Sequence, residues 1–164
     1  MRIRFNKTAA LAAIIGVLGS GTAQAACWSP QAAEAAEVRD LETMLMVASL
    51  RCRLTRQNFI SDYNSFVRSS RSALVEANDR LRGHYASSGG LNAYDRYVTS
   101  LANRHGAGSA GLDCQDMKML LDDAKDAGAS VAQLAKLARS VAISLKSGPA
   151  LPGGRCDQVM ARAR

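Results

Sequence analysis

Apolar residues recur at intervals of three and four along most of the chain, which is the spacing of one face of an α-helix. In the first such stretch, residues 30–54, the apolar face runs through Val38, Leu41 and Leu45. The same spacing predicts four further helices, over residues 59–86, 91–106, 114–127 and 131–146. No segment alternates apolar and polar residues with the period of two that a half-buried strand requires. We therefore expect an all-α fold, a bundle of about five antiparallel helices.

Residues suited to capping helix ends mark the boundaries of these segments. Ser29 precedes Pro30, the combination of an N-cap and a proline in the first turn. Asp113 and Ser130 are placed to cap the fourth and fifth helices, and Gly106 and Gly128 to end the third and fourth. Their agreement with the apolar spacing supports the predicted helix ends.

The first 25 residues have the layout of a secretory signal peptide. Arg2, Arg4 and Lys7 precede an apolar run over residues 9–18, and Ala23-Gln24-Ala25 is a small-x-small cleavage pattern. The apolar run is about half as long as the ~20 residues of a membrane-spanning helix. We expect cleavage after Ala25 and a periplasmic or secreted protein without a stable membrane anchor.

Cleavage leaves residues 26–164, which we expect to form a single helical domain with an irregular C-terminal tail from about residue 147. Two alternatives concern the N-terminus. In the first, the apolar run is retained as a membrane anchor. In the second, Cys27 is acylated after cleavage, although Gln24 stands where lipoproteins carry an apolar residue.

The four cysteines, Cys27, Cys52, Cys114 and Cys156, all follow the signal peptide, and an even number in an exported chain favours two disulfides. A continuous first helix separates Cys27 from Cys52 by about 35 Å, too far for a disulfide. Two connectivities remain. In an antiparallel bundle the end of the first helix lies beside the start of the fourth, which favours Cys52–Cys114 and Cys27–Cys156.

The net charge of +7 belongs partly to the signal peptide, which carries three of the 21 basic residues and none of the 14 acidic ones. The remaining charge of +4 is too small to predict nucleic-acid binding. Basic residues still gather in two places and form a candidate anion-binding patch, made up of Arg51, Arg53, Arg56, Arg68 and Arg71. Interleaved acidic residues favour an ordinary solvated surface as the alternative.

Residues 106–111, Gly-Ala-Gly-Ser-Ala-Gly, match the G-x-G-x-x-G fingerprint of dinucleotide-binding folds. Such a motif suggests an enzyme that uses adenosine, S-adenosylhomocysteine or NAD. The fingerprint requires a buried strand before it, and residues 98–105 instead form the end of an amphipathic helix. We therefore expect a loop between two helices.

Other catalytic and metal-binding patterns are not found. The two histidines, His84 and His105, end different helices and are expected at opposite ends of the bundle, without an acidic residue to orient either. The pairs Met44/Met46 and Met117/Met119 point to opposite sides of a helix, so packing is favoured over copper binding. We expect no catalytic residues, no cofactor and no metal.

Most of the aromatic surface is contributed by Tyr63, Phe66, Tyr94 and Tyr97, which are predicted to meet where two helices pack. Rings and hydroxyls together can line a pocket for a small molecule. Plain core packing is the alternative for all four.

The sequence Ala26-Cys27-Trp28 after the cleavage site, the segment Leu151–Cys156 and the four cysteines resemble small exported helical proteins of Gram-negative bacteria. The resemblance implies no activity and no functional residues. We therefore expect an exported, non-enzymatic binding or structural protein whose partner is another envelope protein or a small ligand.

Overall fold

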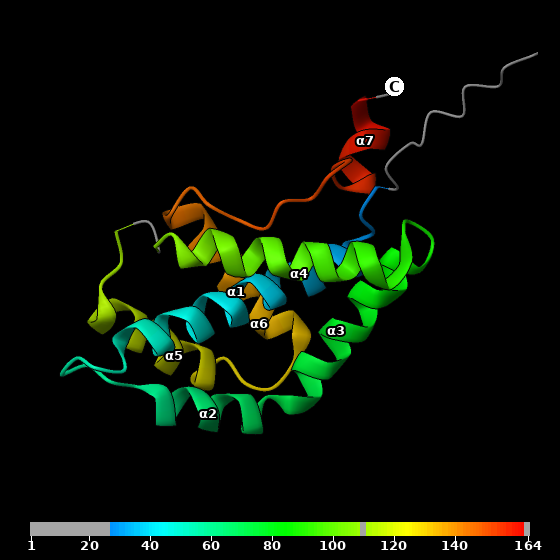
Figure 1. Cartoon of the computed structure of the whole chain (residues 1–164). Helices are drawn as coiled ribbons and strands as arrows, with labels where there is room; N and C mark the ends of the chain where they lie inside the picture. Colours follow the sequence, from blue (N-terminus) through cyan, green and yellow to red (C-terminus); the bar gives the residue numbers. More distant parts are fainter. Residues whose placement is uncertain (1–26, 109–110, 163–164) are drawn as a thin grey trace, which may run out of the picture.

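The computed structural model describes residues 27–108 and 111–162. Within these ranges the chain forms helices and no β-strand: α1 (Pro30–Cys52), α2 (Ile60–Ser69), α3 (Arg71–Ala86), α4 (Gly90–Gly106), α5 (Cys114–Asp126), α6 (Val131–Ser144) and α7 (Cys156–Arg162). The all-α prediction is confirmed (Figure 1). The predicted signal peptide, residues 1–25, lies outside the described residues.

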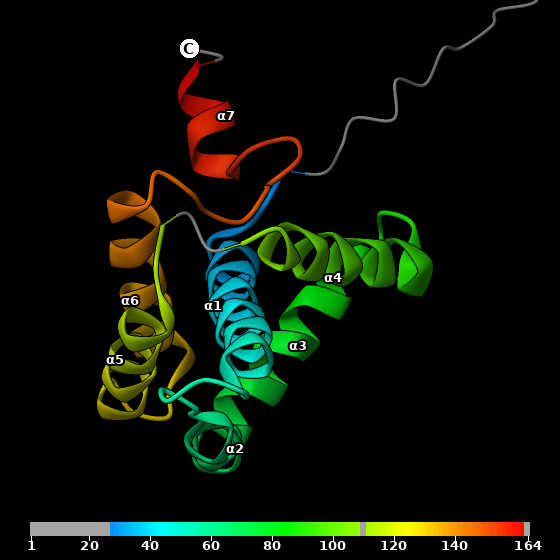
Figure 2. The same ribbon diagram turned by 60° about the vertical axis from the view of Figure 1, so that its left-hand side comes forward.

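Helix α1 is the centre of the fold. It packs against α2, α3, α4, α5 and α6, which Figure 2 shows arranged around it. Fourteen of its 23 residues are buried, more than one apolar face can supply. The predicted apolar face through Val38, Leu41 and Leu45 is buried, and it is only part of the buried surface, because neighbours cover α1 on most of its circumference.

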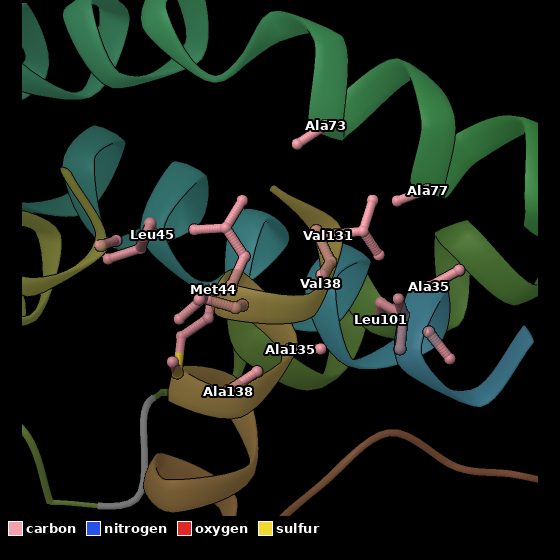
Figure 3. Packing of buried hydrophobic residues seen from close by; sticks show 14 of the residues in the cluster. Ala35, Val38, Met44, Leu45, Ala73, Ala77, Leu101, Val131, Ala135 and Ala138 are labelled. Atoms are coloured by element: carbon pink, nitrogen blue, oxygen red, sulfur yellow. The ribbon is translucent and has the colours of Figure 1, made fainter. Parts of the chain in front are cut away.

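Small side chains allow these neighbours to approach α1 closely. Buried alanines come from four helices: Ala32, Ala33, Ala35, Ala36 and Ala48 of α1, Ala73 and Ala77 of α3, Ala124 of α5, and Ala135 and Ala138 of α6. Figure 3 shows Val38 and Leu101 among several of them. Because a methyl group projects little beyond the backbone, helices can pack around α1 without leaving voids.

The predicted second helix, residues 59–86, is two helices that meet at Ser70. Figure 1 shows the chain change direction between α2 and α3. Ser70 leaves the helical conformation, at φ −96° and ψ 12°, and the hydroxyl of Ser69 donates to the Phe66 carbonyl. Serine side chains compete with backbone hydrogen bonds in this way, so an apolar spacing that continues through the break does not reveal it.

The caps of the later helices are as predicted. Asp113 accepts from the backbone of Gln115 and Asp116 and completes a capping box at the start of α5. Ser130 caps α6, and Gly128 takes a positive φ of 86° after α5. The start of α5 lies at the end of α1, because Cys114, the first residue of α5, is bonded to Cys52.

Two disulfides join the ends of α1 to the rest of the chain. Cys52 is bonded to Cys114, and Cys27 to Cys156, which confirms the favoured connectivity. The Cys27 sulfur is thus occupied, which is incompatible with its acylation. None of the described helices is both long and apolar enough to cross a membrane.

The two ends of the described chain meet at Trp28. Its backbone exchanges hydrogen bonds with Gly154 and Cys156, and its indole donates to the Pro152 carbonyl over 3.0 Å. The prediction of an irregular tail holds for residues 147–155, but not beyond, because α7 follows. The seven residues of α7 have no buried side chain, so neither periodicity nor core packing signals this helix.

Replacing Cys27 and Cys156 together by serine should lower the free energy of unfolding by about 2–5 kcal/mol, because the disulfide closes a very long loop. The tail should also loosen, so that trypsin cuts the folded protein after Arg155. Urea denaturation and timed digestion measure the two effects. The matched variant Cys52→Ser/Cys114→Ser should lose stability but keep Arg155 protected; equal cleavage of both variants contradicts the prediction.

Candidate functional site

Three acidic residues of α1 are enclosed by the helices around it. Glu37 and Glu42 are buried, and the side chain of Asp40 is 15% exposed. A buried carboxylate is costly unless cations or hydrogen-bond donors compensate it. Each of the three has such partners, and together they organise the polar part of the interior.

Glu37 binds two arginines from distant parts of the chain. Arg139 of α6 donates to one carboxylate oxygen over 2.5 Å, and Arg155 of the tail donates to the other. Burial raises the pKa of the Glu37 carboxyl above its usual value, and the two guanidinium groups act in the opposite direction. The carboxylate thereby ties α6 and the tail to the central helix.

Asp40 lies one turn further along and contacts the end of α4. Its Oδ1 lies 2.6 Å from Nε2 of His105 and also accepts from Arg104. Arg104 donates in addition to the Gly148 carbonyl over 2.6 Å. The sequence analysis expected no acidic partner for His105, and this expectation is wrong. Asp40 lies 65 positions away in the sequence, and the packing of α4 on α1 brings it close.

Two of the three acidic residues, Glu37 and Asp40, border a small internal cavity. It has a volume of about 20 Å³, enough for one water molecule. Asp40 and His105 contribute polar atoms, while the rest of its wall is largely apolar and includes Leu41, Met44 and Val141. A cavity of this size cannot admit a substrate.

The cavity adjoins a wider surface groove, which we call the basic groove. Its volume is about 390 Å³, and its lining consists of Glu37, Arg139, Ala142, Ile143, Lys146, Ser147, Gly148, Pro149 and Arg155. Four of these residues, Glu37, Ala142, Ser147 and Pro149, also line the internal cavity. The groove therefore has three cationic side chains, one buried carboxylate and an apolar wall.

Lys146 stands out in this groove because its backbone has a positive φ of 49°. It follows the end of α6, where the N–H of Ser147 bonds to the Ala142 carbonyl, the arrangement that ends many helices with a left-handed residue. Glycine usually occupies this position, since a Cβ makes the conformation unfavourable. Lys146 is the only non-glycine residue in the described part of the chain with a positive φ.

His105 and Asp40 take part in an internal contact. His105 is only 6% exposed and both it and Asp40 are held in an internal network. Nucleophilic catalysis needs an activated hydroxyl or thiol within hydrogen-bond reach of the base, and no such contact to His105 is found among the described residues. The described part of the chain also has no cluster of three metal-ligating side chains.

The four aromatic residues proposed as a pocket do not gather at one place. Tyr63 donates to Glu42 over 2.6 Å, and Phe66 beside it is core. Tyr97 instead packs on Trp28, next to the N-terminus of α1. Twelve residues of α1 separate this end from Glu42, about 18 Å along the axis, so the structure does not bring all four rings together.

Tyr94 lies in a second groove, which is lined by residues of α1, α2, α3 and α4. Its hydroxyl contacts the Asn78 amide oxygen, and the Arg82 guanidinium lies 5.5 Å from its ring centre. Arg39 and Arg71 line the same groove, which has a volume of about 330 Å³. Part of the predicted aromatic set and part of the predicted basic patch therefore meet here.

The predicted basic patch is divided by the fold. Arg51, Arg53 and Arg56 lie at the end of α1 and in the following turn, whereas Arg68 and Arg71 flank the junction of α2 and α3. Arg71 shares its groove with Arg39, which precedes Arg51 by twelve residues of α1, or about 18 Å. The cations of the basic groove belong to neither group.

The glycines of the G-x-G-x-x-G match join α4 to α5. Gly106 ends α4, and Gly108 and Gly111 have φ values of 117° and 89°. Residues 109 and 110 lie outside the described residues. A helix precedes the motif where a nucleotide-binding fold has a strand.

The two histidines contact different parts of the chain. His84 stacks on Trp28 near the start of α1, with ring centres 3.9 Å apart, while His105 contacts Asp40 ten residues into that helix. Burial lowers the pKa of the His84 imidazole. His84 thus belongs to the contact that joins the two ends of the chain.

The sequence gives only an indirect signal for the basic groove. Glu34, Glu37 and Asp40 occur among alanines and other apolar residues at three-residue spacing, so they share a face of a helix that has little polar surface elsewhere. That pattern indicates buried acidic groups. It does not identify Arg139, Lys146 and Arg155 as the cations that face them.

Searches of protein-family models, of curated proteins and of solved structures found no match for this chain.

Replacing Glu37 by glutamine should lower the free energy of unfolding by about 1–3 kcal/mol, because two guanidinium groups lose the carboxylate that compensates them. Urea denaturation measures the change. Glu76→Gln is the matched control, since Glu76 forms an exposed ion pair with Arg80 on α3, and it should cost less than about 0.5 kcal/mol. Equal effects of the two substitutions contradict a role for Glu37 in holding α6 and the tail.

The emission of Trp28, the one tryptophan of the chain, should fall as pH decreases below about 6.5. The pKa of His84 is lower in the folded than in the unfolded chain. His84 therefore leaves the free energy of unfolding unchanged above about pH 7. It lowers this free energy as the pH falls, because the imidazole of His84 is protonated in the unfolded chain before it is protonated in the folded chain. Protonation of the stacked imidazole quenches the indole.

A fluorescence titration of the folded protein with pH measures the midpoint of the fall in Trp28 emission. His84→Gln should abolish the transition, and His105→Gln should leave it in place. A transition that persists in His84→Gln contradicts the assignment.

Proposed function

We propose that the protein is an exported, non-enzymatic binding protein, and that the basic groove binds a small ligand which carries an anionic group on an apolar body. The observation that carries the proposal is the convergence of three cations from separate segments on an apolar wall. Arg139 comes from α6, Lys146 from the turn after it, and Arg155 from the tail. Export follows from the expected signal peptide and is supported by two disulfides.

The charges of the groove favour an anion. One buried carboxylate, Glu37, faces three cations, so the lining keeps a net charge of +2. Glu37 holds Arg139 and Arg155 in place by one nitrogen each, Nη1 and Nη2 respectively. A guanidinium has five N–H donors, which leaves donors for a ligand carboxylate or phosphate. The side chains of Arg139 and Arg155 are 39% and 25% exposed.

The apolar wall favours a ligand with more than a charged group. Ala142, Ile143 and Pro149 line the groove, and Ile143 is 78% exposed. An exposed isoleucine beside three cations suits an amphiphilic anion, since burying apolar surface contributes about 25 cal/mol per Å². An inorganic anion would contact the cations and leave the apolar wall uncovered.

The conformation of Lys146 supports a role in binding rather than in stability. A left-handed residue that is not glycine costs stability, and such residues cluster at functional sites. Lysine near a helix C-terminus also interacts favourably with the helix dipole, which is a stabilising role. The two roles predict opposite outcomes when Lys146 is replaced by glycine.

Octanoate is a suitable probe of the groove because it combines a carboxylate with an apolar chain. It should raise the melting temperature and give a saturable binding isotherm at millimolar concentration. 1-Octanol and inorganic phosphate, which carry one feature each, should bind at least fivefold more weakly. Equal responses to octanoate and 1-octanol would show that the cations do not contribute.

Lys146→Gly should weaken octanoate binding about five- to tenfold, as expected for loss of one charge-assisted contact. The same variant should be more stable than the original protein by about 0.5–1 kcal/mol, because glycine removes the backbone strain. Calorimetric titration and urea denaturation measure the two quantities.

Lys136→Gln, an exposed substitution on α6 outside the groove, is the control for loss of charge and should leave binding unchanged. If Lys146→Gly binds octanoate with unchanged affinity, or if both variants lose the same affinity, the groove is not the binding site.

A further inference from the structure

The C-terminal helix α7 has two exposed apolar side chains and a basic end. Val159 and Met160 are 43% and 67% exposed, and Arg162 closes the helix. The helix projects from the body in both views of the fold (Figures 1 and 2). No residue of α7 is buried, so its apolar side chains have no partner within the described part of the chain that would cover them fully.

A matching surface lies between α5 and α6. This acidic groove has a volume of about 320 Å³ and is lined by Leu112, Asp116, Met119, Leu120, Asp123, Leu137, Ser140, Val141, Ser144 and Leu145. Six of these residues are leucine, valine or methionine, and the two charged ones are both aspartate. Met119 is 53% exposed. The groove thus combines an apolar surface with negative charge.

The two surfaces complement each other in both respects. Val159 and Met160 offer apolar groups of a size that suits a groove of leucine and methionine, and Arg162 offers the charge that Asp116 and Asp123 lack. Short helices recognise grooves in this manner, with apolar anchors in the groove and charges at its rim. We propose that α7 of one copy of the chain binds in the acidic groove of a second copy.

Within one copy the disulfides hold the start of α7 and the start of α5 at opposite ends of α1. Cys156, the first residue of α7, is bonded to Cys27 at the start of α1, whereas Cys114, the first residue of α5, is bonded to Cys52 at its end. A helix of 23 residues is about 35 Å long. In the structure α7 lies away from the start of its own acidic groove and none of its residues is buried, so we assign the contact to a second copy.

The contact is a head-to-tail one, because it joins two different surfaces. Where the second copy does not return its own helix to the first, each copy keeps a free helix at one end and a free groove at the other, and association continues beyond the dimer. A single seven-residue helix covers much less than the surface of a stable complex. The association is therefore weak and becomes visible as concentration rises. It does not depend on the ligand proposed for the basic groove.

Analytical ultracentrifugation of the full disulfide-bonded protein tests the contact. The average mass should rise above that of the monomer between about 10 µM and 1 mM, in the range of weak interfaces, and no species should dominate. Two variants should each remain monomeric: Met160→Glu/Arg162→Glu, which alters the helix, and Met119→Lys/Asp123→Lys, which alters the groove.

A mixture of the two variants provides the decisive measurement. The helix variant retains an intact groove and the groove variant an intact helix, so an equimolar mixture should form a one-to-one dimer and nothing larger. Leu91→Lys/Asp95→Lys on α4 is the matched control, with the same spacing and the same change in charge at exposed positions. It should associate like the original protein.

Circular dichroism shows whether each variant is folded, and octanoate binding should be unchanged in all of them. A protein that stays monomeric at 1 mM overturns the proposal, as does association that both variants retain. Failure of octanoate binding with normal association would instead count against the basic groove alone.

Discussion

The enclosure of α1 is the constraint on which the rest of the structure depends. A helix covered by five others must satisfy its own polar groups with partners from those helices. Glu37, Asp40 and Glu42 each do so with a different part of the chain, namely α6 and the tail, α4, and α2. The polar contacts of one helix thus determine where its neighbours lie.

The arginines that compensate the buried charge of Glu37 also line the basic groove, to which we assign ligand binding. Arg139 and Arg155 reach Glu37 from the rim of a groove, so their remaining donors and the adjacent Lys146 face outward. Asp40 binds Arg104, which in turn binds the Gly148 carbonyl and positions the turn that carries Lys146. The buried carboxylate and the proposed anion site therefore share the same two arginines.

Local features could be predicted from the sequence, and long-range polar contacts could not. The caps at Ser29, Asp113 and Ser130 depend on neighbouring residues only, and the disulfides follow from helix length and direction. The break at Ser70 was missed because the apolar spacing continues through it. The Asp40–His105 contact and the three cations of the basic groove arise from packing between segments, and a single sequence carries no record of which cation faces which acid.

The order of the cysteines makes α1 important before the fold is complete. The chain emerges with its N-terminus first, so Cys27 and Cys52 are available to each other before Cys114 and Cys156 exist, and the native pairs are nested rather than consecutive. Once α1 forms, it holds the first two thiols about 35 Å apart. A Cys27–Cys52 disulfide is therefore incompatible with a continuous α1, and the central helix excludes this pairing for as long as it is formed.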